Sequence, residues 1–425
     1  MRLLDGVTVL DLTHAYSGPF CTMHLADHGA TVIKIESPPY GDQTRAWPPF
    51  VEGCEEGSGY FSLINRNKKG MALNLKTEEG KRVFKDLVRK ADVVCENFRS
   101  GTMEKLGLGY DDLAQINPGL IYASASGFGT TGPYASRPAY DIVAQGMSGM
   151  MSITGFADSP PTTTGPGIGD NYTGTYMALG IAMALYNRGK TGKGYRLEVA
   201  MLDTLYSVLE HAVVTYTIAG QIPGRVGNCD PAAAPFDSFE AKDGMFVMAV
   251  STDKHFRILC AAIGKPEMAD DPRFISNKQR IAHYESDLRP LLLEYTMGKT
   301  IDEMEETLVN AGIPFGRVLN VAEATEHPQI QARNMIQEVD DPLLGKVRLV
   351  GIPIKVHGLS DSIERPAPRL GEHNTEVLRS LLGASDADIA SLAADRVIFH
   401  GVAPTPEPKR ATSSAITNLC GAVVR

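Results

Sequence analysis

A strand–helix–strand pattern near the N-terminus restricts the folds that this chain can adopt. Val7–Leu12 (VTVLDL) is a predicted strand, Gly18–His28 a predicted helix and Thr31–Glu36 (TVIKIE) a second strand. Strands joined through a helix pair in parallel, and parallel sheets are covered by helices. The pattern therefore predicts an α/β fold. The turn after the first strand reads THAYSGPF without GxGxxG, so a nicotinamide or flavin dinucleotide site is not expected there.

Further strand and helix patterns follow along the chain. We expect strands at Met71–Leu75, Val93–Asn97, Leu120–Ser126 and Tyr195–Val199, and helices at Glu78–Lys90, Asp141–Met151, Asn171–Asn187 and Leu202–Ala219. The loop GQIPGRVGNCDPAAAP, at residues 220–235, indicates a domain change. We predict a large Rossmann-like domain with a parallel sheet, built first from residues 1–220. A smaller α/β domain at 225–315, a return to the large domain at 316–402 and a flexible tail at 403–425 complete the prediction.

Composition excludes several classes of function. The net charge of −9 argues against a nucleic-acid partner, and no apolar run approaches the roughly 18 residues of a membrane span. The first residues lead directly into a strand pattern, so no signal peptide is expected. Six scattered cysteines without a CxxC pair favour reduced thiols and a cytoplasmic protein. The ten histidines contain no HExxH pattern, and we expect no metal site.

Asp170 is the most informative carboxylate of the sequence. Gly165, Pro166, Gly167 and Gly169 precede it, so a bulky substrate can approach the backbone closely. The expected helix begins directly after Asp170, which places this residue at the N-cap position, where the helix dipole favours an anion. From these residues alone, a simple helix cap is the more common interpretation, and a nucleophile is the alternative.

A local basic cluster in this acidic protein allows two interpretations. Its members are Arg66, Lys68, Lys69 and Lys76. They form either a solvated face or a site for a phosphorylated ligand, because lysine and arginine are the usual phosphate partners.

Several segments, in a fixed order, together resemble the class III coenzyme A transferases, which include formyl-CoA:oxalate and carnitine CoA-transferases. The similarity runs from about residue 3 to 383 and includes NRNKKGMALNLKTEEG, ENFRSGTMEKLGLGYDDL, SGFGTTGPYASRPAYD, GDNYTG, KTGKGYRLEVAMLD, GIPFGRVL and APRLGEHN. The resemblance implies transfer of coenzyme A from an acyl-CoA to a small carboxylic acid, with both as substrates and no tightly bound cofactor. It also implies an interlocked homodimer.

The resemblance further implies roles for individual residues. GDNYTG matches the catalytic segment of the family, so Asp170 is the expected nucleophile. Positions expected to hold the CoA nucleotide are Leu73, Asn74, Lys76, Asn97, Phe98, Arg99 and Lys105. Positions expected in the substrate pocket are His14, Tyr16, Tyr140 and Gly169, of which His14 and Tyr16 follow the first strand, where open α/β sheets bind ligands.

Two departures from the formyl/oxalate enzymes argue against oxalate and formate as substrates. Tyr16 replaces a glutamine of the first loop, and residues 228–239 (NCDPAAAPFDSF) replace a glycine-rich loop over the active site. Pro231 and Pro235 stiffen that loop, which argues against a mobile lid.

Three functions are compatible with this pattern. In the favoured one, Asp170 attacks the thioester and passes through an acyl anhydride and an aspartyl-CoA thioester. An α-methylacyl-CoA racemase of the same fold needs a histidine where this chain has Tyr140, and a phenol exchanges protons poorly near neutral pH. A non-catalytic CoA-binding protein would keep the basic segments without needing an ionised Asp170.

Overall fold

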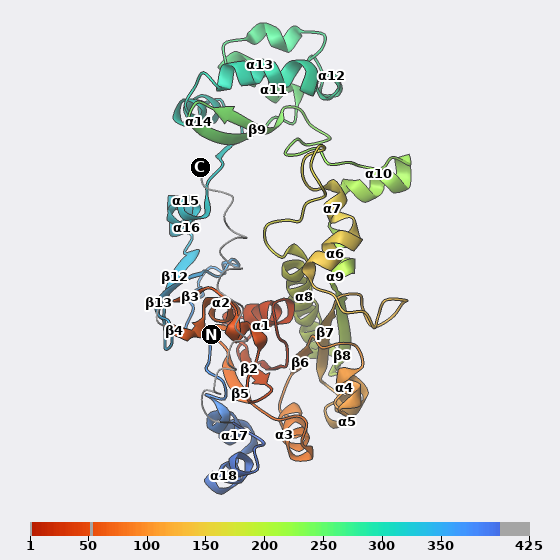
Figure 1. Cartoon of the computed structure of the whole chain (residues 1–425), viewed down its shortest axis with the longest axis vertical. Coiled ribbons are helices and arrows are strands. Elements are labelled where there is room, and N and C mark those ends of the chain that lie inside the picture. The colour runs from red at the N-terminus through yellow and green to blue at the C-terminus, as the bar shows by residue number, and fades with distance from the viewer. Residues whose placement is uncertain (1, 52–53, 400–425) are drawn as a thin grey trace, which may run out of the picture. The chain divides into compact units, whose positions relative to one another are not determined.

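The computed structural model describes residues 2–51 and 54–399, and the chain divides into two compact units. Unit 1 is built from three stretches, the first up to Ser148, then Gly165–Val208, and the last from Ala332 onward. Unit 2 comprises Gly149–Thr164 and Leu209–Gln331. Figure 1 labels the elements in chain order. The sequence-based domain boundaries stay predictions, and the expected tail at 403–425 lies outside the described residues.

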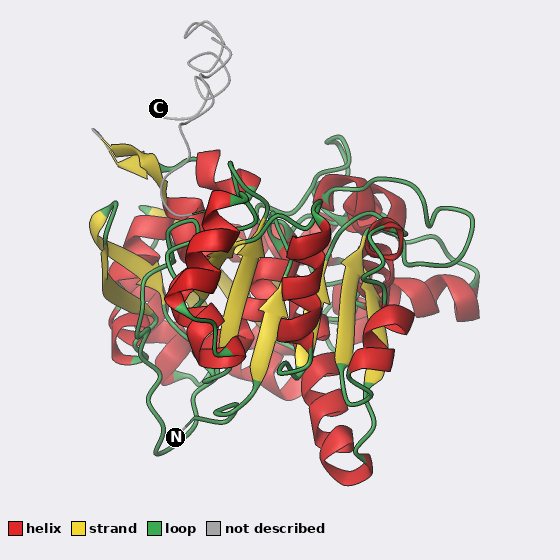
Figure 2. Ribbon diagram, turned by 90° about the horizontal axis from the view of Figure 1, so that it is seen from below, coloured by secondary structure: helices red, strands yellow, loops and turns green. Residues whose placement is uncertain are grey.

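A six-stranded parallel sheet organises unit 1 (Figure 2). In spatial order its strands are β5 (Lys69–Ala72), β2 (Thr31–Glu36), β1 (Thr8–Asp11), β6 (Val93–Glu96), β7 (Ile121–Ser126) and β8 (Tyr195–Ala200). Every neighbouring pair is parallel. Numbered along the chain, this is the order 3-2-1-4-5-6 of doubly wound folds, with its switch point between β1 and β6. The expected Rossmann-like α/β fold is confirmed.

Helices cover both faces of this sheet because its strands alternate apolar side chains between two cores. Val9 and Val32 face a core shared with α1 (Ser17–Asp27) and α8 (Ile168–Thr191). Leu10 and Ile33 face the opposite core. The helices that contribute to the second core are α3 (Glu78–Val88), α5 (Tyr110–Ile116), α17 (Asn374–Leu382) and α18 (Asp386–Ala394). Burial on both faces explains why β1, β2, β6 and β7 have no exposed residue, whereas the edge strand β8 exposes Arg196 and Glu198.

The other elements of unit 1 are short. They are η1 (Gln43–Ala46), β3 (Phe50–Val51), β4 (Cys54–Ser58), α2 (Gly59–Asn65), α4 (Thr102–Lys105), α6 (Asp141–Ser148), α9 (Met201–Ser207), β12 (Ile336–Asp341) and β13 (Gly345–Val350). The β3–β4 and β12–β13 pairs are antiparallel ribbons that the sequence pattern did not predict.

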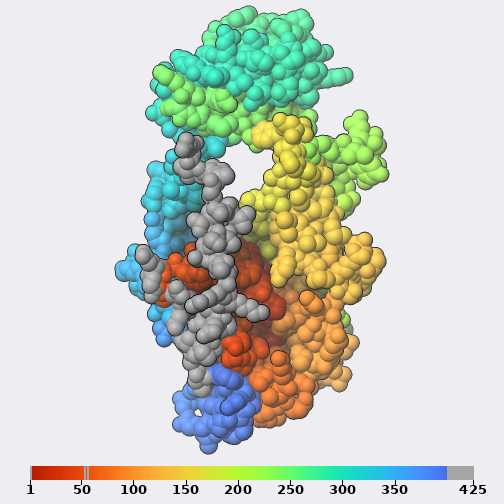
Figure 3. Space-filling model, viewed as in Figure 1, coloured from red at the N-terminus to blue at the C-terminus, as the bar shows by residue number. Residues whose placement is uncertain are grey.

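Unit 2 has its own core around a small antiparallel sheet in the order β11-β10-β9. The stacked rings of Phe239, Phe246 and Phe315 lie on this sheet. Figure 3 shows the outer surface of the elements around it in green to cyan. Its strands are β9 (Phe236–Ala241), β10 (Gly244–Ala249) and β11 (Phe315–Arg317). Its helices and helical turns are α7 (Met150–Ile153), α10 (His211–Ala219), α11 (Asp253–Ala262), η2 (Pro266–Asp270), α12 (Asn277–Ala282), η3 (Tyr284–Leu288), α13 (Arg289–Thr296), α14 (Ile301–Asn310) and α15 (Val321–Glu326), with α16 (Pro328–Ala332) at the unit boundary.

Three helix predictions were wrong in their extent. The helix expected at Asp141–Met151 ends at Ser148, and Gly149, with a φ of 96°, separates it from α7. The helix expected at Asn171–Asn187 begins earlier, at Ile168, and ends at Thr191. The single helix expected at Leu202–Ala219 is divided into α9 and α10, and Glu210 between them has a φ of 50°. This left-handed conformation cannot continue a right-handed helix. No helix among the described residues combines the length and apolarity needed to cross a membrane.

Candidate active site

Asp170 lies in the first turn of α8, as its third residue, and is not the N-cap that the sequence predicted. The cap function is supplied by Asp141, the first residue of α6. One oxygen of Asp141 accepts the backbone N–H of Gly169 at 2.7 Å and that of Asp170 at 3.4 Å. Because a carboxylate from another helix satisfies these amides, the Asp170 carboxylate is left for other contacts.

The Asp170 carboxylate is held by the N-terminus of α1. Ser17, the first residue of that helix, lies beside Asp170, and its hydroxyl and backbone N–H lower the pKa of the carboxylate. Gly174 permits this approach because a Cβ there would lie 2.5 Å from the carbonyl oxygen of Ser17. A helix N-terminus favours an anion, so the ionised form of Asp170 has a fixed hydrogen-bonding partner.

Asp170 is nevertheless more basic than an ordinary aspartate. Burial raises its pKa to about 6, the charge of Asp141 adds to the increase, and the hydrogen bonds from Ser17 oppose it. A carboxylate with this pKa is mostly ionised at neutral pH while being a stronger base than in solution. Perturbed carboxylates of this kind gather at functional sites.

Aromatic side chains surround the same point. The ring of Tyr16 stacks on Phe20 at a centroid distance of 5.4 Å and contacts Tyr60 at 5.6 Å. Trp47 in turn meets Tyr60 edge-on at 5.3 Å. Burial raises the pKa of Tyr16, and the Asp170 charge adds to that increase. Burial likewise raises the pKa of Tyr60, with smaller contributions from Tyr16 and Asp170.

Sequence reasoning missed Ser17, Tyr60, Trp47 and Asp141 as members of this site. For Trp47 the sequence offered one signal of a special position, because it is the single tryptophan of the chain. The other three occupy ordinary helix positions, and only the packing of α1, α2 and α6 brings them near Asp170.

The predicted residues His14, Asn97 and Phe98 meet at the switch point between β1 and β6. The Asn97 side chain forms two hydrogen bonds with the backbone of His14, at 2.9 Å to its N–H and 2.7 Å to its carbonyl. The Phe98 ring packs edge-on against His14 at 5.1 Å. Burial lowers the pKa of His14, which favours a neutral imidazole. These contacts join the two loops where doubly wound folds bind ligands.

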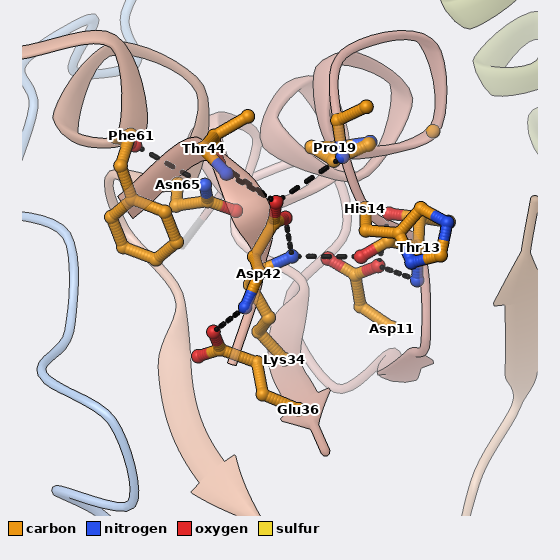
Figure 4. A network of polar contacts seen from close by, with 12 residues as sticks. Asp11, Thr13, His14, Pro19, Lys34, Glu36, Asp42, Thr44, Phe61 and Asn65 are labelled. Carbon is orange, nitrogen blue, oxygen red and sulfur yellow. Dashed lines mark hydrogen bonds and ion pairs between the residues drawn. The ribbon is translucent and has the colours of Figure 1, made fainter. Parts of the chain in front are cut away.

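A buried network of charges holds the loop that carries His14, Tyr16 and Ser17 (Figure 4). Lys34 donates to Asp42 at 2.9 Å and to the Thr13 carbonyl at 2.8 Å. Asp11 pairs with Lys68 at 3.0 Å and also accepts the hydroxyl of Thr13 at 2.5 Å. These four charged side chains are fully buried. Since a buried charge must keep its partner, the network fixes the conformation of this loop.

The two interpretations of the basic cluster are therefore wrong for two of its members. Arg66 and Lys68 are buried, with Arg66 paired to Asp27 at 2.8 Å, so neither forms a solvated face or a phosphate site. Lys69 pairs with Glu376 at 2.9 Å. The sequence could not distinguish these cases, because the acidic partners lie far away along the chain.

The other predicted residues occupy different environments. Leu73 is buried in the core, which leaves its backbone as the only group for ligand contact, and Asn74 accepts the N–H of Lys76 at 3.1 Å. Lys76, Arg99 and Lys105 are exposed. The segments at 73–76 and 97–99 follow β5 and β6, so both lie at the carboxyl edge of the sheet. Tyr140, 66% exposed, directly precedes Asp141, and Gly169 is buried beneath the Asp141 carboxylate.

One group of possible metal ligands exists among the described residues, in unit 2. It consists of Cys229, Asp237 and Glu285, with ligand atoms within 4.8 Å of one another. The buried Asp237 already accepts hydrogen bonds from Arg289 at 3.0 Å and Tyr284 at 3.1 Å. A guanidinium in direct contact repels a cation, so we assign no metal to this group.

Comparisons with known proteins match nearly the whole chain to one family. The CoA-transferase family III profile matches residues 4–374. The chain is 46% identical to an acetyl-CoA:oxalate CoA-transferase of Acetobacter aceti, covering 90% of this chain and 96% of the relative. It is 43% identical to a succinyl-CoA:mesaconate CoA-transferase of Haloarcula marismortui, covering 89% and 96%. The crystal structure of a CAIB/BAIF family protein from Brucella suis matches with a TM-score of 0.78 and 38% identity, covering 89% and 99%.

These matches cover almost the whole chain and confirm the resemblance inferred from its segments. They confirm the expected enzyme class as well, transfer of coenzyme A between an acyl-CoA thioester and a carboxylic acid. The chain therefore belongs to CoA-transferase family III.

Proposed function

We propose that Asp170 is the covalent nucleophile of a coenzyme A transfer. Its carboxylate attacks the thioester carbonyl, the C–S bond breaks, and CoA thiolate leaves an acyl-aspartyl anhydride. The thiolate then attacks the aspartyl carbonyl and expels the donor acid, which leaves an aspartyl-CoA thioester. The acceptor carboxylate attacks this thioester and forms a second anhydride, whose acyl carbonyl the thiolate attacks to release the new acyl-CoA and Asp170. Splitting the exchange in this way keeps the activated acyl group from water.

One observation carries this proposal. The Asp170 carboxylate is half-buried beside Ser17, its cap function is taken by Asp141, and its pKa is raised to about 6. A residue that served only as a helix cap would bind the amides of its own helix.

The two backbone amides at the start of α8 are already bonded, so the donors that stabilise the oxyanions of the reaction must come from elsewhere. The Gly169 and Asp170 amides donate to Asp141. The N–H and hydroxyl of Ser17 lower the pKa of the Asp170 carboxylate, so we propose that they stabilise the aspartyl oxyanion. A donor of this kind is typically worth about 3–4 kcal/mol in the transition state.

The CoA nucleotide is proposed to bind across the loops after β5 and β6. Exposed Lys76, Arg99 and Lys105 supply cations for its phosphates, which are typical partners of such side chains. The side chains of Asn97 and Phe98 are committed to His14, so we assign their contribution to shaping the loop.

The acceptor is proposed to be a small carboxylic acid bound near Tyr16, Tyr60 and Trp47. The relatives reported above are named for oxalate and mesaconate, which are both dicarboxylic acids. The departure at Tyr16 favours other acids over oxalate and formate. A panel of acids that includes oxalate and mesaconate tests this preference directly.

A racemase remains the rival inside the same fold. It requires a second proton-transfer group opposite Asp170, and the matching position holds Tyr140, which is 66% exposed. We therefore favour transfer. Rapid deuterium exchange at Cα of a 2-methylacyl-CoA, without any acceptor acid, would instead support racemisation.

The experiment that tests the nucleophile compares Asp170→Ala with Asp203→Ala. Asp203 is the matched control, because it is the third residue of α9, as Asp170 is of α8, and is exposed. We expect loss of transfer in the first variant and wild-type activity in the second. Borohydride or hydroxylamine trapping after acyl-CoA addition should modify the Asp170 peptide in the wild type. Wild-type transfer by Asp170→Ala would exclude the nucleophile, and absence of both trapping and transfer would favour a non-catalytic CoA-binding protein.

Assembly and location complete the proposal. We propose an interlocked homodimer, supported by large apolar side chains that α8 leaves exposed, namely Tyr172, Tyr176, Leu179, Met183 and Tyr186. Size-exclusion chromatography with light scattering tests this assembly. We propose a cytoplasmic location from the scattered cysteines, and acyl-CoA as a substrate without a tightly bound cofactor.

A further inference from the structure

The carboxylate of Asp141 joins the starts of two helices beside Asp170. One of its oxygens accepts the Gly169 N–H at 2.7 Å and the Asp170 N–H at 3.4 Å. The other accepts the side-chain amide of Gln145 at 2.6 Å, one turn further along α6. Asp141 is therefore fixed from both sides, and through its amide contacts it fixes the first turn of α8.

Gly169 makes room for this contact. A Cβ at Gly169 would lie 2.8 Å from the Asp141 oxygen and 3.0 Å from Leu205 and Met201 of α9. Any side chain at this position must displace the Asp141 carboxylate and would press on the side chains of Leu205 and Met201. Glycine is therefore needed at position 169, because it lets the Asp141 carboxylate reach the backbone amide directly.

We propose that Asp141 is a positioning residue for coenzyme A transfer, acting through both its hydrogen bonds and its charge. Its hydrogen bonds hold the α8 turn so that the Asp170 carboxylate points to Ser17 at the start of α1. Its negative charge, close to Asp170, keeps that carboxylate a strong nucleophile. The inference rests on the proposed nucleophilic role of Asp170 and adds a second carboxylate to the site.

The groups around Asp170 make the sign of the charge effect clear. Burial and Asp141 on α6 raise the pKa of Asp170, and the hydrogen bonds from Ser17 on α1 lower it. Tyr16, before α1, and Tyr60, on α2, interact electrostatically with Asp170. From α9, the groups that approach the adjacent Gly169 are apolar. Asp141 is therefore the group whose removal should make Asp170 more acidic.

Asparagine and alanine separate the two effects of Asp141. Asp141→Asn keeps an oxygen for the Gly169 amide but removes the charge, and a rotated Gln145 amide can accept from the new NH₂ group. We expect the acidic limb of kcat/KM to move down by about one pH unit, as for loss of a nearby like charge. Asp141→Ala removes the acceptor too, so we expect the same shift with a fall in kcat of about 10-fold or more, since misplaced reacting groups lose rate. Asp203→Asn, at an exposed position of α9, is the charge-matched control and should change neither quantity.

A titration that does not depend on turnover makes the inference separable from the proposed function. The Asp170 carboxyl is followed by ¹³C NMR in aspartate-labelled protein and assigned by its loss in Asp170→Asn. Asp141→Asn should lower the titration midpoint of this signal, and Asp203→Asn should leave it in place. An unchanged midpoint in Asp141→Asn overturns the charge effect, and wild-type kcat in Asp141→Ala overturns the positioning effect. If Asp170→Ala retains transfer, the proposed nucleophile fails, while the NMR midpoints still decide the electrostatic effect of Asp141.

Discussion

A methyl group added at Gly174 should uncouple Asp170 from Ser17. In Gly174→Ala, the new Cβ would lie 2.5 Å from the Ser17 carbonyl oxygen, 3.0 Å from the Phe20 ring and 3.1 Å from the Cys21 backbone nitrogen. Two of these atoms belong to the backbone of α1 and cannot rotate away. Restoring ordinary contact therefore requires α1 and α8 to separate locally by roughly 1 Å.

The separation of α1 from α8 should lower both the stability of the protein and the rate of transfer. Overpacking costs about 1–3 kcal/mol, and the better helix propensity of alanine offsets about 1 kcal/mol of this, so the net loss of stability is modest. The effect on catalysis is larger, because a misplacement of about 1 Å can reduce the rate by about 100-fold. Since the hydrogen bonds from Ser17 lower the pKa of Asp170, weakening them should also move the acidic limb of kcat/KM to higher pH. The sign is opposite to that expected for Asp141→Asn.

The assay compares Gly174→Ala with Gly189→Ala on the same helix. A Cβ at Gly189 meets no atom within 4 Å, so this control gains the helix propensity without the clash. Steady-state transfer is measured from about pH 4 to 8, roughly two units on each side of the Asp170 pKa of about 6, and stability by urea unfolding. A folded Gly174→Ala enzyme with wild-type kcat and an unmoved acidic limb would refute the coupling of Asp170 to α1.

Three further predictions follow from the charges of unit 1. Folding raises the pKa of Asp170 from 3.8 to about 6, so its stabilising contribution is complete below pH 3.8 and is lost as the pH rises through 6. Asp170→Asn should accordingly increase the unfolding free energy at pH 7.5 by about 1–3 kcal/mol, with no gain near pH 4, in urea titrations at both pH values. Alanine at Lys76, Arg99 or Lys105 should raise KM for acyl-CoA several-fold with little change in kcat, and should not affect an acyl-pantetheine substrate, which lacks the nucleotide. Lys68→Met leaves the carboxylate of Asp11 buried without its cation and should destabilise the protein by about 3–5 kcal/mol. A second substitution that removes the Asp11 carboxylate should restore part of this stability.

Local sequence patterns were sufficient to predict the strands of the parallel sheet and the alternation of strands and helices along the chain. The strand expected at Thr31–Glu36 has those bounds in the structure, and the one at Tyr195–Val199 ends one residue later. Prediction succeeds at Thr31–Glu36 because that strand is buried on both faces, and at Tyr195–Ala200 because this edge strand alternates between exposed and less exposed residues. Prediction failed for the helix at Leu202–Ala219, where a single left-handed residue, Glu210, interrupts an otherwise helical pattern.

The candidate site was only partly accessible from the sequence. The family segments identified Asp170, and the strand ends identified His14 and Asn97. The cap assigned to Asp170 was wrong, because a carboxylate from α6 competes for the same amides and wins them. The basic cluster was misread for a similar reason, since Arg66 and Lys68 find acidic partners on α1 and β1.

The sequence by itself determined the α/β class and the family, and it indicated Asp170 as the candidate nucleophile, because periodicity and segment order are local properties. Only the tertiary structure decided how that carboxylate is held. Asp141, Ser17 and Gly174 come from three separate helices, and their relation to Asp170 depends on how those helices pack. Hydrogen bonds and charge interactions act over a few ångströms in space, whatever the separation along the chain.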